Sequence, residues 1–143
     1  MKHRKEVGAF VYRFSKKGRL KLLLVSNRKQ TRWILPKGQT EASLADKKVA
    51  LKEAHEEAGI IGRVDKRLLP KVAYYQSSSG PVALHVYPMQ IEKKLKDWPE
   101  QSFRRRAMVD INTALLMVRK QALLELIRNF SSDILALEHA GQS

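Results

Sequence analysis

The chain has no cysteine among its 143 residues, which excludes disulfides, thiolate metal sites and a thiol nucleophile. Any bound metal must therefore be held by oxygen or imidazole. Aromatic residues make up only 7% of the chain and do not cluster, whereas a surface that stacks nucleic-acid bases would need such a cluster. No window approaches the roughly 18 apolar residues of a membrane span, and the basic start lacks the apolar core of a signal peptide, so we expect a cytoplasmic protein that does not bind membranes.

Acidic residues are also scarce. The chain has 14 Asp and Glu against 28 Lys and Arg, so its formal net charge is +14. This charge costs self-repulsion and is typical of a protein with polyanionic partners, among them nucleic acid, polyphosphate, inositol phosphates and acidic surfaces. For any single lysine, solubility is the simpler explanation. The length and a hydrophobic content of 43% predict one globular domain over residues 1–143.

The first half of the chain alternates apolar runs with turn residues. Residues 6–14 and 19–27 predict a β-hairpin, and residues 31–43 predict a short strand that enters a loop broken by Pro and Gly. A helix is expected from Ser43 to Ala58, where Gly59 supplies a C-terminal stop. This order of elements is a strand-loop-helix-loop unit.

The second half predicts another strand pair and then a helical region. The strands are expected over residues 62–78 and 80–95, joined by a Ser- and Gly-rich turn, and the chain becomes helical from Asn112. Five apolar residues then recur at helical spacing, as a stripe that would cover one face of a sheet: Leu123, Leu126, Ile127, Phe130 and Ile134.

Three glutamates, Glu53, Glu56 and Glu57, crowd into five positions of the predicted helix. Side chains at positions i, i+3 and i+4 share one face of a helix, so these carboxylates would repel one another unless a cation lay among them. Hard divalent ions prefer carboxylate oxygen, and the spacing therefore suits Mg²⁺ better than zinc. The alternative is a solvated helix face whose glutamates pair with neighbouring lysines.

The segment from Gly38 to Ile60, GQTEASLADKKVALKEAHEEAGI, resembles the Nudix box, G-x5-E-x7-R-E-U-x-E-E-x-G-U, in which U is a bulky aliphatic residue. Six of the nine specified positions match at the prescribed spacing. The residues before the box and the strand and loop at 84–102 are similar to diphosphoinositol polyphosphate phosphohydrolases and small bacterial relatives. The resemblance implies an α/β fold, an α/β/α sandwich with a mixed sheet and a catalytic loop-helix-loop.

The resemblance also implies a reaction. Enzymes of this family hydrolyse a nucleoside diphosphate linked to another group, or a related diphosphate, with Mg²⁺ or Mn²⁺ and an activated water. By this resemblance Glu56 and Glu57 are the main metal ligands, and Glu53 is a ligand that helps deprotonate water. A backbone carbonyl near Lys37 and Gly38 would complete the ligand set.

The resemblance implies substrate contacts outside the box as well. The positions expected to hold substrate phosphates are Arg28, Arg32, Lys37, Arg104 and Arg106. Each of them has an equally simple reading as solvated surface. His55 is expected to be a packed or surface residue, and Trp33 a core residue or a pocket wall.

The chain departs from the box at two linked positions. Leu44 stands where the first Glu belongs and Lys52 where the Arg belongs, and Ala54 replaces a bulky aliphatic. In the family that Glu and Arg support the catalytic helix together, and losing both leaves no buried carboxylate without its partner. Relatives also carry an acidic residue near position 107, where this chain has Ala107, and Asp110 is the nearest acid.

We therefore predict a Mg²⁺-dependent hydrolase, with Mn²⁺ as the alternative ion, that cleaves a phosphoanhydride bond in a polyanionic substrate. Dinucleoside polyphosphates and diphosphoinositol polyphosphates are the favoured substrates, and another nucleoside diphosphate linked to a second group is the further possibility. Two alternatives stay open, a degenerate domain that binds phosphate without hydrolysis and an RNA 5′-end pyrophosphohydrolase. The oligomeric state is left open.

Overall fold

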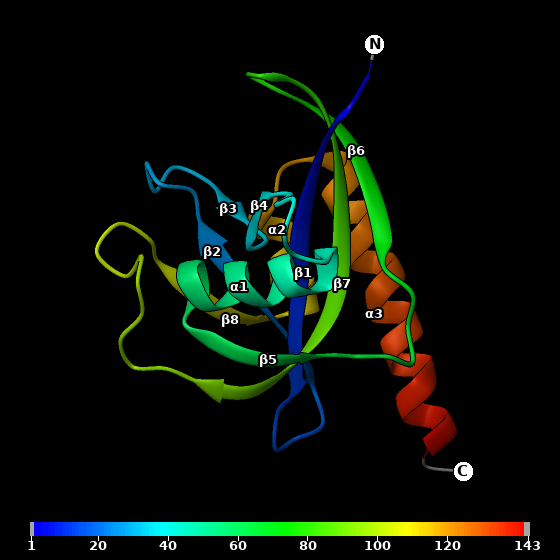
Figure 1. Ribbon diagram of the computed structural model, residues 1–143. Coiled ribbons are helices and arrows are strands. Elements are labelled where there is room, and N and C mark those ends of the chain that lie inside the picture. Colours follow the sequence, from blue (N-terminus) through cyan, green and yellow to red (C-terminus); the bar gives the residue numbers. More distant parts are fainter. Residues whose placement is uncertain (1, 142–143) are drawn as a thin grey trace.

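The computed structural model describes residues 2–141 and is built around a mixed sheet of eight strands (Figure 1). The strands are β1 (Arg4–Phe14), β2 (Leu20–Ser26), β3 (Trp33–Ile34), β4 (Lys37–Gln39), β5 (Ile60–Val64), β6 (Lys71–Ser77), β7 (Gly80–Lys94) and β8 (Arg106–Asp110). The helices are α1 (Asp46–Ala58), α2 (Ile111–Met117) and α3 (Gln121–Gly141). No helix in this described part of the chain is long and apolar enough to cross a membrane.

The two longest strands, β1 and β7, lie side by side at the centre and are the parallel pair of the sheet. The order β3-β2-β1-β7-β5 forms the main path, with β4 added to β1, β6 to β7 and β8 to β2, all antiparallel. β7 has two antiparallel partners in succession, since β6 pairs with its first half and β5 with its second half. This double use of β7 places the end of β5, the strand that follows α1, next to the central pair.

Strand β1 is buried on both faces because helices cover both sides of the sheet. Val7, Ala9 and Val11 belong to the core that includes the apolar residues of α1. Phe10 and Tyr12, the alternate residues, belong to the core that includes α3. Since successive side chains of a strand point to opposite faces, one strand contributes to both cores.

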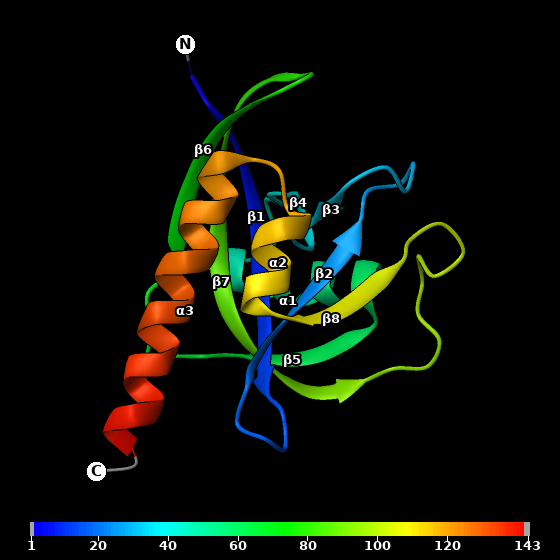
Figure 2. The ribbon, with the colours of Figure 1, turned by 180° about the vertical axis from the view of Figure 1, so that it is seen from behind.

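The helices form the two outer layers (Figures 1 and 2). α1 crosses one face of the sheet, whereas α2 and α3 lie against the other. All five residues of the predicted apolar stripe, from Leu123 to Ile134, are buried in the α3 core. The predicted α/β/α sandwich with a mixed sheet is confirmed.

Several predicted element bounds were wrong. α1 begins at Asp46 and not at Ser43, because residues 41–44 form a turn in which the Leu44 amide donates to the Glu41 carbonyl at 3.2 Å. The single strand predicted over residues 62–78 is two strands, β5 and β6, which pair with different halves of β7. The helical region from Asn112 is likewise two helices. Gly59 ends α1 as predicted, with a φ of 66° in the left-handed region that favours glycine.

Candidate functional site

Small residues let α1 lie close to the sheet. Val49, Ala50, Ala54 and Ala58 are fully buried against it. Ala54 stands where the sequence motif has a bulky aliphatic residue. Its side chain therefore fills less space between α1 and the sheet than the motif residue would. The close fit leaves the glutamates of α1 along the flank of the helix that faces the segment 37–39.

Glu57 is held at both oxygens. Its Oε1 accepts a hydrogen bond from the Lys37 backbone N–H at 3.1 Å, and its Oε2 accepts one from Arg104 Nη2 at 3.1 Å. The side chain is 5% exposed. The carboxylate is therefore fixed between strand β4 and the loop that precedes β8.

Glu53 lies directly against Gly38. A Cβ atom at position 38 would sit 2.4 Å from Glu53 Cδ and Oε1, so only glycine leaves room for this carboxylate. The glycine at position 38 of the sequence motif therefore has a steric reason. Glu56 is half-buried, and its backbone carbonyl accepts a hydrogen bond from the Glu100 N–H at 3.0 Å.

The environment of Glu57 and Glu53 disfavours the charge of both carboxyls and raises both pKa values. Burial raises the pKa of Glu57 to about 8, and the charge of Arg104 and the Lys37 hydrogen bond offset only part of that rise. Burial also raises the pKa of Glu53, with further contributions from the negative charges of Glu56 and Glu100. A bound cation would reverse this logic, because it would favour the ionised form of each group.

The carboxylates match a hard divalent ion in chemistry. In the arrangement described for residues 2–141, however, no three His, Asp or Glu side chains form a group that could hold a metal ion. Glu57 instead faces Arg104. The donor set of Glu53, Glu56 and Glu57 thus fits Mg²⁺ in type and charge, and its oxygens must turn toward a common point when an ion binds.

Glu100 is a fourth carboxylate of the site that the sequence analysis missed. It lies in the loop between β7 and β8, where its Oε1 accepts a hydrogen bond from Arg104 Nε at 2.8 Å. Its charge helps to raise the pKa of both Glu53 and Glu57. The sequence search looked for an acid near Ala107, but that residue pairs with Leu24 inside the sheet. A search of the whole loop for acids would have found Glu100.

A cleft of about 550 Å³ opens beside Glu57, and we call it the helix cleft. Four of the five predicted phosphate contacts line it together with Glu57: Arg28, Arg32, Lys37 and Arg104. Arg28 and Arg32 are exposed, and the Arg28 guanidinium lies 4.9 Å above the centre of the Phe103 ring. The fold therefore gathers side chains 76 residues apart around one carboxylate.

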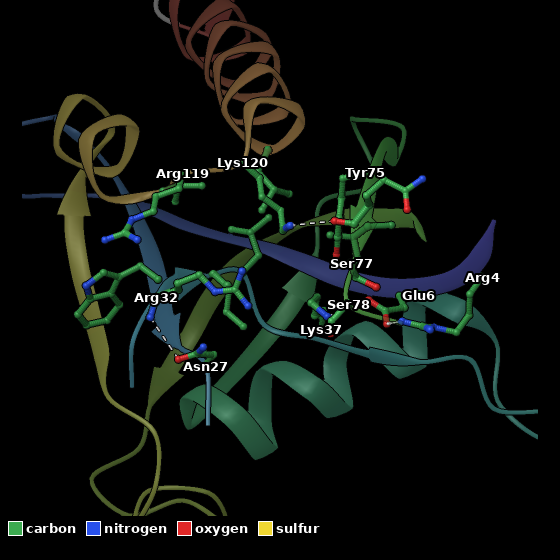
Figure 3. A pocket seen from close by; sticks show the side chains of 17 residues that line it. Arg4, Glu6, Asn27, Arg32, Lys37, Tyr75, Ser77, Ser78, Arg119 and Lys120 are labelled. Carbon is green, nitrogen blue, oxygen red and sulfur yellow. Dashed lines mark hydrogen bonds and ion pairs between the residues drawn. The ribbon is translucent and has the colours of Figure 1, made fainter. Parts of the chain in front are cut away.

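A second cleft of about 450 Å³ adjoins the first, and we call it the strand cleft (Figure 3). The two clefts share Asn27, Arg32, Ile34, Lys37 and Ser78. The cations of the strand cleft are Arg4, Arg32, Lys37, Arg119 and Lys120. Arg119 and Lys120 lie just before the start of α3. The apolar wall of this cleft includes Trp33, Leu35, Tyr75, Leu84, Val118 and Leu123. The wall suits a ring or sugar, and the cations suit an anion.

Glu6 is the one acid among the residues that line the strand cleft. It is 6% exposed and accepts from Lys37 Nζ at 2.8 Å and from Arg4 Nη2 at 3.0 Å. Burial alone would raise its pKa, but the hydrogen bonds and charges of Lys37 and Arg4 lower it below the usual range. Glu6 therefore stays ionised and holds both cations at the cleft wall.

Arg106 lies outside both clefts. Its guanidinium donates to the Ala58 carbonyl at 2.8 Å and the Leu95 carbonyl at 2.6 Å, and it stacks 3.9 Å above the centre of the Trp98 ring. The Ala58 carbonyl belongs to the last turn of α1, where a cation is favourable. The structure thus places Arg106 as a support of the C-terminal end of α1, away from the position that a phosphate ligand would need.

The two departures from the motif have different environments. Leu44 packs against the core between α1 and the sheet. Lys52 Nζ forms an ion pair with Glu41 Oε2 at 2.7 Å, so its acidic partner lies three positions earlier than the motif places one. Asp110 also lies apart from the glutamates, since it pairs with Arg19 and Lys21 at the opposite end of β8. Asp110 does not take the place of an acid at position 107.

Trp33 and His55 both lie as the sequence predicted. Trp33 is half-buried in β3 and lines the strand cleft, as expected of a pocket wall. His55 is half-buried on α1 and lines neither cleft. It is a packing residue of the helix.

Comparison with known proteins gives a family and a fold. A model described as NUDIX domain matches residues 2–130. Nudix hydrolase 21, chloroplastic, from Arabidopsis thaliana is 29% identical over 135 residues, which cover 90% of this chain and 66% of the relative. Nudix hydrolase 17, mitochondrial, from the same plant is 31% identical over 142 residues, covering 92% and 78%. The chain spans about two thirds of the length of the first relative, and the cytoplasmic location stays a prediction.

Diphosphoinositol polyphosphate phosphohydrolase 3-alpha from Homo sapiens is 30% identical over 79 residues, which cover 55% of this chain and 46% of the relative. Among solved structures, a C. elegans Ap4A hydrolase binary complex superposes with a TM-score of 0.79 at 18% identity, covering 93% of this chain and 98% of that one. The NUDIX domain of Shewanella oneidensis NrtR, in complex with ADP ribose, gives 0.74 at 16% identity, covering 94% and 90%. At such identities the structures show a shared fold.

Proposed function

The chain belongs to the NUDIX domain family, and from that premise we propose that it is a metal-dependent hydrolase that cleaves a phosphoanhydride bond in a polyanionic diphosphate substrate. One observation carries the proposal. Glu57 of the motif helix lines the same cleft as Arg28, Arg32 and Lys37, so an acidic metal-binding helix and a basic anion-binding wall meet at one place. Hydrolysis of a phosphoanhydride needs both of these surfaces.

The acidic side of the cleft is the metal-binding side. Glu53, Glu56 and Glu57 would hold Mg²⁺ or Mn²⁺ together with the backbone carbonyl of Gly38. Glu100 is a further carboxylate nearby, whose charge acts on Glu53 and Glu57. When bound, the ion supplies an acidified water and offsets charge on the phosphate oxygens. In this proposal Glu53, which lies against Gly38, would accept a proton from that water.

The basic side binds and orients the substrate. Arg28 and Arg32 are exposed at the rim of the helix cleft and are free of any ion pair with the described acids, so they are available to phosphate oxygens. The planar guanidinium group suits the two-oxygen recognition of phosphate. Lys37 contributes a positive charge between the two clefts.

The strand cleft limits the kind of substrate. A part of the substrate that continues from the phosphates into this cleft meets Trp33 and Tyr75 on the apolar wall and Arg119 and Lys120 at the mouth. An apolar ring followed by more negative charge satisfies both features. Dinucleoside polyphosphates combine these features, and diphosphoinositol polyphosphates satisfy the charge alone. These are the two substrate classes that we propose.

The test is phosphate release from a panel of substrates, with Mg²⁺ and then Mn²⁺. The panel contains dinucleoside polyphosphates, diphosphoinositol polyphosphates, nucleotide sugars and RNA with a triphosphate or capped 5′ end. Turnover of either of the first two classes that stops in EDTA supports the proposal. Turnover of RNA ends alone makes the protein an RNA pyrophosphohydrolase.

Calorimetric titration with Mn²⁺ tests metal binding independently of turnover. The wild type is expected to bind the ion, and Glu57→Gln is expected to weaken binding markedly. Arg63→Gln is the matched control, since Arg63 is exposed on β5 and lines neither the helix cleft nor the strand cleft. No turnover on any substrate, together with tight binding of the polyphosphates, would instead identify a phosphate-binding module.

A further inference from the structure

Arg104 is a buried arginine whose three nitrogens all donate to protein acceptors. Nη2 donates to Glu57 Oε2 at 3.1 Å, Nε to Glu100 Oε1 at 2.8 Å and Nη1 to the Ser26 carbonyl at 3.0 Å. The residue is 8% exposed. It therefore joins three separate segments, namely α1, the loop between β7 and β8, and the end of β2.

The neighbouring arginine makes a useful contrast. Arg105 is exposed, and its guanidinium lies 5.9 Å from the centre of the Trp33 ring. Its backbone N–H, like the side chain of Arg104, binds Ser26, through Oγ at 2.9 Å. Two successive residues of the same type thus differ in whether the charge faces solvent or the carboxylates of the site.

The charges around Arg104 require it to stay in place. Glu57 and Glu100 flank the guanidinium on two sides, and both carboxylate side chains are at least four-fifths buried. Removing the guanidinium from such a group leaves buried carboxyl oxygens without their hydrogen-bond donor, which is strongly unfavourable. The planar guanidinium reaches three acceptors in different directions at once, whereas a lysine offers all its donors from a single atom.

We propose that Arg104 is a positioning residue, which keeps the carboxylates of Glu57 and Glu100 beside the helix cleft, from where they can turn toward a bound ion, and that it is not a ligand of the substrate. The inference rests on the proposed function, because it assigns a role within that site. The Glu100 N–H also donates to the Glu56 carbonyl, and this second hydrogen bond connects the loop to the motif helix. Among the arginines that line the helix cleft, Arg28 and Arg32 then remain to contact phosphate.

Steady-state kinetics separates positioning from binding. Arg104→Met is expected to lower kcat at least tenfold with KM changed less than about threefold, since the substrate keeps its own ligands. Arg104→Lys is expected to recover part of kcat, because it restores the charge but not the geometry. Arg105→Met is the control and is expected to behave as the wild type. A raised KM with unchanged kcat in Arg104→Met would make Arg104 a substrate ligand and overturn the inference.

A double-mutant cycle in EDTA tests the contact without turnover. Unfolding by urea is measured for Arg104→Met, Glu100→Gln and the double variant, and again with Glu57→Gln in place of Glu100→Gln. Each pair is expected to be non-additive by at least fivefold in the unfolding constant. Additive effects in both cycles would overturn the inference. If the wild type hydrolyses no substrate, the proposed function fails, and the cycles still show whether Arg104 fixes these two carboxylates.

Discussion

The two long helices cover opposite faces of one sheet and differ in what they bring to it (Figures 1 and 2). α3 has 21 residues and buries large side chains, such as Phe130, whose ring centre lies 5.0 Å from that of Phe10. α1 has 13 residues and buries mainly alanine and valine, together with the carboxylate of Glu57. α3 supplies apolar area, and α1 supplies charge.

This difference teaches how a short acidic helix is kept in place. Small side chains bring α1 close to the sheet but bury little area, so contacts at its ends and flank must contribute. The Lys37 amide and Arg104 hold Glu57, and Arg106 holds the carbonyl of Ala58. Substitutions in α3 should therefore mainly lower the free energy of unfolding, and substitutions in α1 should mainly lower turnover.

The largest effect on stability is expected from Phe130→Ala on α3. The ring is fully buried, and its loss creates a cavity in the core that joins α3 to the sheet. A cost of roughly 3–5 kcal/mol is expected in the free energy of unfolding. Urea denaturation measures it, with Leu135→Ala on the exposed side of the helix as the control. A cost equal to that of the control would show that α3 is not the main apolar layer.

On α1, Glu57→Gln is expected to act on turnover. It should lower kcat by roughly 10² or more, because it removes a metal ligand of the proposed reaction. Folding should survive, since the shape of the side chain is kept and a buried charge is lost. Kinetics on the best substrate of the panel, with circular dichroism as a folding check, measures both. A folded variant that keeps most of its activity would remove Glu57 from the catalytic group.

The raised pKa of Glu57 gives stability a pH dependence in EDTA. The carboxyl titrates near 4.5 when unfolded and near 8 when folded, so between these values the folded state binds more protons. Stability is therefore expected to fall as pH rises through this window, by at most about 1.4 kcal/mol per pH unit. Urea denaturation between pH 5 and 8 measures the slope, which should be shallower in Glu57→Gln. Parallel curves for the two proteins would place the native pKa near its ordinary value.

The smallest effect is expected at the ion pair of Lys52 with Glu41. Both side chains are more than one-third exposed, so Lys52→Met should leave stability nearly unchanged and change kcat by less than twofold. Lys48→Met, on the exposed side of the same helix, is the control. A tenfold loss of kcat in Lys52→Met alone would show that this pair orients the catalytic glutamates.

The structure also changes what is expected when the motif residues are restored. The motif has Glu at position 44 and Arg at position 52, and restoring both would be expected to raise activity if they formed a contact there. Leu44, however, packs on the core between α1 and the sheet, and a carboxylate there would replace apolar contacts. We now expect Leu44→Glu to lower stability, with or without the change at Lys52.

The sequence by itself determined the elements whose signals are local. The spacing of Leu123 to Ile134 predicted the buried face of α3, and Gly59 predicted the end of α1, because periodicity and left-handed backbone are properties of a few adjacent residues. The motif in residues 38–60 placed Glu53, Glu56 and Glu57 on one helix with Gly38 beside them. These inferences needed no knowledge of the rest of the chain.

Only the tertiary structure decided which distant residues meet those glutamates. Arg104 and Arg106 are two positions apart in the sequence, yet one contacts Glu57 and the other the end of α1, because strand pairing begins between them and fixes the direction of each side chain. Glu100 reaches the site through a loop whose path no local pattern encodes. Contacts of this kind depend on how β7 and β8 are placed against α1, and that placement comes from packing across the whole sheet.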